Sequence, residues 1–198
     1  MNQPNPDRIF GIADDATFRD EALALFRFQA ERCEPYRQYL DLIGVAAEEV
    51  REVEQIPFLP IGLFKTHNIY CGEEAPEQIF TSSSTGGGGP SRHPMARLSI
   101  YERAFRGAFR YFYGDAVEWS IYGLLPSYLE RKGSSLIYMV DRLIADAGGH
   151  GGFYLDDYKK LLADLAADSK PKILLGVSYA LWDLAEQYAP KLSNTIIM

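Results

Sequence analysis

The chain has 198 residues, of which 47% are hydrophobic and 24% charged, a balance typical of one globular domain. Its net charge of −7 argues against a general nucleic-acid binder, because phosphate neutralisation needs a basic surface. No apolar run reaches the roughly 20 residues that span a bilayer, and the first residues have no features of a secretory signal. Two cysteines are too few for a disulfide framework, so we expect reduced thiols in a cytoplasmic protein.

The first 50 residues are expected to form a helical lead-in. Apolar residues recur at helical spacing after Thr17, and Asp14 is a candidate cap for the helix. Pro35 should interrupt the helix, and Gly44 should end the stretch that follows.

The next segment is rich in strand and turn signals. Two prolines within residues 56–61 exclude a regular helix or a central strand, so we expect an ordered apolar connector. Short strands are expected at residues 69–71 and 78–81.

The second half alternates between helical and extended patterns. This alternation favours an α/β fold, with a mostly parallel sheet flanked by helices, in a single domain over residues 1–198. The expected helices are 98–112, 136–144, 158–165 and 181–188, and the expected strands are 117–125, 153–154, 173–177 and 195–198.

A Ser/Gly loop, residues 81–90, carries the strongest chemical signal. It follows an expected strand and precedes an expected helix. Its glycines allow successive N–H groups to turn inward, its hydroxyls add donors, and Arg92 adds positive charge, which together suit a triphosphate. A plain flexible loop is the alternative. The segment is not a Walker A loop, because no Gly-Lys-Ser/Thr follows the glycines.

Ser178 follows an expected strand and approximates a nucleophile elbow, with Ala180 in the last glycine position. A hydrolase of that type places its histidine after the serine in the chain. All three histidines of this chain precede Ser178, so a helix cap is the favoured interpretation.

Two smaller motifs have competing interpretations. His67 and Cys71 have the spacing of half a zinc site, although no second half is visible; His67 and Lys65 could instead line a cleft. The four glycines around His150 could approach a ligand, but a plain turn is favoured.

Several separated blocks resemble the acyl-protein synthetase family, the LuxE-type branch of the adenylate-forming, acyl-CoA synthetase-like enzymes. The resemblance extends from about Phe10 to Met198 and implies the N-terminal part of the large domain of such an enzyme. The blocks are residues 56–67, the Ser/Gly loop together with Ser91-Arg92-His93, residues 124–131, residues 133–136 and residues 176–181.

The resemblance implies a ligase that uses ATP and Mg²⁺ to convert a fatty or other carboxylic acid into an acyl-adenylate. The acyl group would then pass to a carrier or to a reductase subunit. In the phosphate loop, Ser84 replaces a glycine of the family pattern and Gly86 replaces a threonine. The implied phosphate-binding residues are Thr81, Ser82, Ser83, Ser84, Thr85, Gly86 and Gly87, and Lys65, His67, Arg92 and His93 are candidates for a ligand cleft.

The next motif of the family, Met-Glu-Thr-Gly-Gly, would begin at Met198. Its glutamate, the expected partner of Mg²⁺, and the later C-terminal lysine have no counterpart in these residues. The resemblance therefore implies a chain that is incomplete and inactive alone. The alternative is a non-catalytic binding domain that partners an acyl-transfer subunit.

Overall fold

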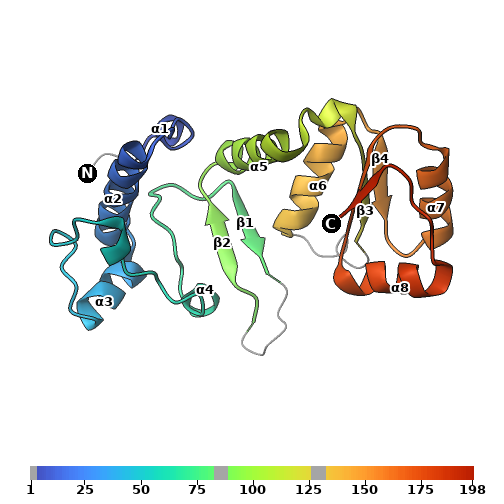
Figure 1. The fold of residues 1–198 in the computed structure, drawn as a ribbon. Coiled ribbons are helices and arrows are strands. Elements are labelled where there is room, and N and C mark those ends of the chain that lie inside the picture. Colours follow the sequence, from blue (N-terminus) through green and yellow to red (C-terminus); the bar gives the residue numbers. More distant parts are fainter. Residues whose placement is uncertain (1–3, 83–88, 126–132) are drawn as a thin grey trace. The chain divides into compact units, whose positions relative to one another are not determined.

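The computed structural model describes residues 4–82, 89–125 and 133–198. Internal contacts divide the chain into two compact units, residues 1–100 and residues 101–198. Figure 1 shows the elements of each unit. The expectation of one α/β domain over residues 1–198 stays a prediction.

The first unit begins with helices, as predicted. The short α1 (Pro6–Ile9) precedes α2 (Asp15–Arg32), whose first turn is capped by the Asp14 carboxylate 2.7 Å from the Thr17 N–H nitrogen. Cys33 separates α2 from α3 (Glu34–Leu42), and Pro35 lies in the first turn of α3, where its missing N–H costs no helical hydrogen bond. The predicted break at Pro35 is confirmed.

The core of the first unit lies between these helices and the irregular chain that follows them. The 3-10 helix η1 (Val53–Gln55) leads into residues 56–61, which form no helix or strand, as predicted. Ile56 and Leu59 of this connector pack against the core. The buried residues of the core are Leu23, Phe26, Ala30, Cys33, Tyr36, Leu40 and Val50.

After α4 (Leu63–Thr66), the first unit ends in a two-stranded antiparallel sheet of β1 (Gln78–Thr81) and β2 (Arg92–Met95). The predicted strand 78–81 is confirmed. The predicted helix 98–112 is present, but the sequence analysis missed β2, which lies between the Ser/Gly loop and that helix. Pro94 obscured β2 in the sequence, although a strand with one open edge tolerates a residue that lacks an N–H.

The predicted strand at residues 69–71 is also wrong, since these residues form no regular element. Their apolar side chains serve a different purpose, because Ile69 and Cys71 pack against the core of the first unit. A strand needs a hydrogen-bonded neighbour, and the sheet described in this unit consists of β1 and β2 alone.

The second unit contains a four-stranded sheet in which every pairing is parallel. Its strands are ordered β4-β3-β5-β6, so the order reverses between β3 and β5. This confirms the α/β class and the parallel sheet flanked by helices. The strands are β3 (Ser120–Leu124), β4 (Gly151–Tyr154), β5 (Lys172–Gly176) and β6 (Thr195–Ile197), and the helices are α5 (Leu98–Tyr113), α6 (Ser135–Asp146), α7 (Tyr158–Ala167) and α8 (Ser178–Tyr188).

Each predicted element of this half is present, and most boundaries move by one to three residues. The 3-10 helix η2 (Ala116–Glu118) takes the place of the first residues of the predicted strand 117–125.

Successive side chains of a strand point to opposite faces of the sheet, and this divides the core of the second unit into two layers. Ile121 and Ile173 belong to a cluster with side chains of α5 and α6. Their neighbours Tyr122 and Leu174 belong to a second cluster with α7 and α8. Helices therefore cover both faces of the sheet, as Figure 1 shows. Of the helices that the structure describes, none has the length and apolar character needed to cross a membrane.

The glycines around His150 form the turn from α6 into β4, as the favoured interpretation predicted. Gly148 and Gly149 have φ angles of +76° and +77°, which bend the chain at the end of the helix. Gly151 has a φ of +101°, and a Cβ atom added there would overlap the backbone of Ile121. This position therefore needs glycine for packing.

Candidate functional site

The predicted phosphate loop joins the two strands of a hairpin. Thr81 ends β1 and is paired across the sheet with Arg92, the first residue of β2. Ser82 follows directly. The other predicted phosphate-binding residues, Ser83, Ser84, Thr85, Gly86 and Gly87, lie outside the described residues.

A group of hydrogen-bonded side chains, which we name the hydroxyl clasp, joins the two ends of the loop: Ser82, Ser91 and His93. The Ser91 hydroxyl donates to Ser82 Oγ over 2.7 Å, and the Ser91 N–H donates to the same oxygen over 3.1 Å. Ser91 Oγ lies 3.0 Å from His93 Nε2, and the Ser82 N–H donates to the Ser91 carbonyl over 3.1 Å. Ser91 is buried, so these contacts fix the loop ends in one geometry.

The outer face of the hairpin has a different character. Side chains alternate between faces along a strand, so Thr81 and Arg92 lie on the face opposite the hydroxyl clasp. Both residues are exposed. Arg92 forms no ion pair with the described residues, which leaves a guanidinium group and a hydroxyl side by side in solvent. This pair can donate hydrogen bonds to an anionic oxygen.

The other two predicted cleft residues lie on or next to α4. Lys65 and His67 are both exposed, and His67 Nδ1 lies 2.8 Å from Thr66 Oγ1. It is Phe64 that contacts β2, stacking on His93 with ring centroids 4.9 Å apart. Within the described chain, no hydrogen bond joins Lys65 or His67 to β2. The expectation of one cleft lined by all four residues stays a prediction.

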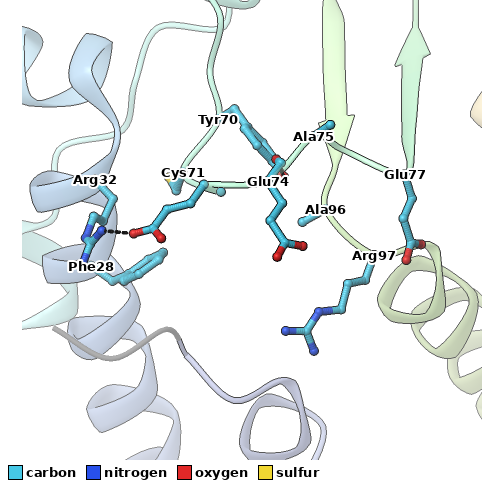
Figure 2. Close-up of a pocket in the computed structure, with 11 residues that line it drawn as sticks. Phe28, Arg32, Tyr70, Cys71, Glu74, Ala75, Glu77, Ala96 and Arg97 are labelled. Carbon is cyan, nitrogen blue, oxygen red and sulfur yellow. Dashed lines mark hydrogen bonds and ion pairs between the residues drawn. The ribbon is translucent and has the colours of Figure 1, made fainter.

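A polar pocket of about 440 Å³ lies elsewhere in the first unit. Figure 2 shows the side chains of Arg32, Glu74 and Arg97 around its opening. Arg32 already forms an ion pair with Glu73, with Nη1 2.5 Å from Oε1. The pocket therefore carries charges of both signs, from two arginines and three glutamates.

An apolar cavity of about 340 Å³ lies in the same unit, among α2, α3 and the connector. Its lining contains aliphatic side chains and five aromatic ones, which are Phe18, Phe26, Tyr36, Phe58 and Phe64. Cys33 and Cys71 also line it, and their side chains hydrogen-bond to each other. The sequence analysis missed this pair, because no spacing rule connects two single cysteines in an irregular unit.

The sequence analysis considered zinc and Mg²⁺ as possible metals. Among residues 4–82, 89–125 and 133–198, no three or more His, Cys, Asp or Glu side chains gather as metal ligands. Cys71 instead has the thiol of Cys33 as its partner. Mg²⁺ usually binds through one or two carboxylates together with substrate phosphates, so the expected role of Mg²⁺ stays a prediction.

The prediction that Ser178 caps α8 is wrong. Val177 occupies the cap position without a side-chain hydrogen bond, and Ser178 is the first residue of the helix. Its side chain is exposed. Ser178 nevertheless lies at the carboxyl end of β5, beside the point where the strand order reverses, and open α/β sheets usually bind ligands there.

Comparison with known proteins does not identify a family: no protein-family model matches the chain, and no match was found among curated proteins.

Proposed function

We propose that the chain supplies the ATP phosphate site of an acyl-adenylate-forming ligase similar to the acyl-protein synthetases. The Ser/Gly loop would hold the phosphates, and the substrate would be a fatty or other carboxylic acid. A carboxylate oxygen would form a bond to the α-phosphorus while the bond from that phosphorus to the bridging oxygen breaks. Pyrophosphate would leave with the electron pair.

The hydroxyl clasp is the observation that carries this proposal. A loop rich in glycine has high conformational entropy, and a ligand that orders it must overcome that entropy. The clasp fixes both ends of the loop through Ser82 and Ser91, with Oγ atoms 2.7 Å apart. Part of the ordering cost is therefore met before a nucleotide arrives.

Charge also supports the proposal. The chain is acidic overall, with a net charge of −7, so a phosphate group needs a local positive partner. Arg92 provides one at the start of β2, and Thr81 pairs with it across the strands. A guanidinium group makes short charge-assisted hydrogen bonds to phosphate oxygens, and a neighbouring hydroxyl adds another donor. The described residues provide no Mg²⁺ ligand cluster, so we assign no step to the metal.

The test is titration of the chain with ATP by calorimetry. We expect saturable binding that Arg92→Gln weakens about tenfold, because a charge-assisted hydrogen bond is lost. Thr81→Val should weaken it about fivefold through loss of a neutral hydrogen bond. The matched control is Arg19→Gln, which removes an exposed arginine from α2 and should leave ATP binding unchanged.

Binding tests the proposal more directly than turnover, because the family's glutamate and lysine have no counterpart in these residues. Absence of ATP binding by the folded chain would overturn the proposal and favour the non-catalytic binding domain. Equal weakening by Arg92→Gln and Arg19→Gln would show that charge alone, and not the hairpin, attracts the nucleotide.

A further inference from the structure

The cysteine pair of the first unit is independent of the phosphate loop. Cys33 is 2% exposed in the core, and Cys71 packs against that core from the irregular segment between α4 and β1. They are the chain's two cysteines, both are free thiols, and their side chains hydrogen-bond to each other. Both also line the apolar cavity of about 340 Å³.

The two sulfur atoms have different surroundings. Cys33 occupies both the C-cap position of α2 and the N-cap position of α3, so the opposite ends of two helix dipoles meet there. The hydrogen bond from the Cys71 thiol lowers the pKa of Cys33, despite its burial. The same hydrogen bond and burial raise the pKa of Cys71. Cys33 is therefore the thiolate of the pair, and Cys71 is the proton donor.

A small reagent has routes to this pair. Cys71 is half-buried and lines both the apolar cavity and the polar pocket, as Figure 2 shows for the polar pocket. Residues 67–77 form no helix or strand, so Cys71 lies in chain that can adjust to the geometry of a disulfide without breaking a regular element. Cys33 is held by the helices on either side of it.

We infer that Cys33 and Cys71 are a reversible redox pair that hydrogen peroxide converts into an intramolecular disulfide. The Cys33 thiolate attacks one peroxide oxygen, the O–O bond breaks, and Cys33 becomes a sulfenic acid. The leaving hydroxide takes the proton of Cys71 and forms water. The Cys71 thiolate then attacks the Cys33 sulfur, the S–O bond breaks, and the second hydroxide takes a proton from solvent. Both sulfurs are oxidised and peroxide is reduced to two waters.

The first test treats the folded chain with a small excess of hydrogen peroxide and measures its intact mass. We expect a loss of two hydrogens per chain, a peptide that links the two cysteines, and full recovery of both thiols with dithiothreitol. A disulfide between two chains would overturn the inference. So would persistence of both thiols under conditions that oxidise the pair in the unfolded chain.

The second test separates the roles of the two thiols. In Cys71→Ser, Cys33 should stop at the sulfenic acid, which dimedone traps. In Cys33→Ser, Cys71 should react at least about tenfold more slowly with peroxide than Cys33 does in the wild-type chain, because its burial still raises the pKa of its thiol. Circular dichroism checks that each variant folds. Equal peroxide rates in the two folded variants would overturn the assignment, and the wild-type mass measurement stands even if a variant does not fold.

Discussion

The two units bury their apolar residues to different degrees. In residues 101–198, Leu124 and Leu174 lie within a sheet that helices cover on both faces, and both are 0% exposed. In residues 1–100, the most buried core side chains, Phe26 and Cys33, are 2% exposed and border a cavity of about 340 Å³. The core of the second unit leaves a smaller apolar pocket, of about 180 Å³, than the helices and the irregular connector of the first unit do.

The regular, well-packed elements and the candidate reactive groups therefore lie in different units of the chain. In the second unit, the apolar residues recur with the spacing of a helix or a strand, so each element buries an apolar face. The first unit contains the hydroxyl clasp, the cysteine pair and both the polar pocket and the apolar cavity described above. Reactive groups commonly lie on irregular chain held by a scaffold, because loops can present polar atoms that a closed core cannot satisfy. Substitutions should therefore affect stability most in the second unit.

The largest effect is expected at the turn into β4. Gly151→Ala should lower the free energy of unfolding by at least about 3 kcal/mol, because the new Cβ atom meets the Ile121 backbone at a φ of +101°. Denaturant unfolding measures the change. The control is Gly149→Ala, where φ is +77° but no atom lies within 4 Å, and about 1 kcal/mol is expected. Equal losses would show that the chain relaxes around Gly151.

The same substitution placed in each unit tests the packing difference directly. Ala180 is 0% exposed on α8, so Ala180→Leu should cost about 2 kcal/mol through overpacking. Ala22 lines the apolar cavity of the first unit. Ala22→Leu should therefore lower the free energy of unfolding by less than about 0.5 kcal/mol, or raise it, because the added atoms fill empty space. A similar cost at both positions, measured by denaturant unfolding, would remove the distinction between the units.

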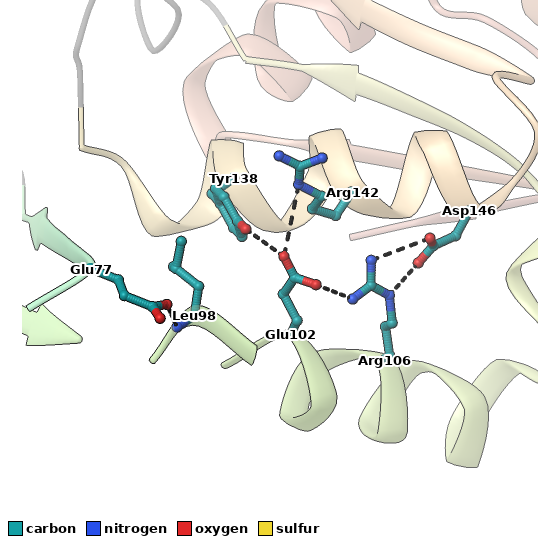
Figure 3. A network of polar contacts seen from close by, with 7 residues as sticks. All are labelled: Glu77, Leu98, Glu102, Arg106, Tyr138, Arg142 and Asp146. Atoms are coloured by element: carbon teal, nitrogen blue, oxygen red, sulfur yellow. Dashed lines mark hydrogen bonds and ion pairs between the residues drawn. The ribbon is translucent and has the colours of Figure 1, made fainter. Parts of the chain in front are cut away.

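An ion-pair network between α5 and α6 gives a pH-dependent effect (Figure 3). Glu102 accepts from the Tyr138 hydroxyl and from Arg106, each over 2.5 Å, and Arg106 Nε lies 2.6 Å from Asp146 Oδ2. The hydrogen bonds from Tyr138 and Arg106 lower the pKa of Glu102 below its ordinary value of 4.5. A lowered folded-state pKa stabilises the fold above the ordinary pKa, and this contribution is lost as the pH falls through the folded-state value.

Glu102→Gln should therefore be less stable than wild type by about 1 kcal/mol at neutral pH, since the network is partly exposed. Unfolding curves of the two proteins should converge as the pH falls below 4.5. A matched control is Glu118→Gln in the same unit, at an exposed position in η2. A difference between wild type and Glu102→Gln that persists in acid would show that packing, and not charge, stabilises this contact.

The sequence predicts the second unit well and the first unit less well, for a physical reason. Helix 158–165 and strand 173–177 bury one face or both faces, so their apolar residues follow the helical or strand pattern. Ile69 and Cys71 are also apolar, but they pack against helices without joining a sheet, and residue type alone does not distinguish the two cases. The hydroxyl clasp required the pairing of β1 with β2, which Pro94 obscured.

The smallest effect on the free energy of unfolding is expected for Ser178→Ala, because the structure shows that Ser178 is not the helix cap. Loss of a helix cap costs about 1 kcal/mol, but Ser178 is exposed at the first position of α8 and makes no cap hydrogen bond. Ser178→Ala should therefore change stability by less than about 0.5 kcal/mol. The control is Ser134→Ala, because Ser134 Oγ accepts from the Ile137 N–H over 3.3 Å, and its loss should cost about 1 kcal/mol. Since no histidine follows Ser178 in the chain, a fluorophosphonate probe should leave it unlabelled. Stoichiometric labelling of Ser178 would instead identify an activated nucleophile at the edge of the sheet.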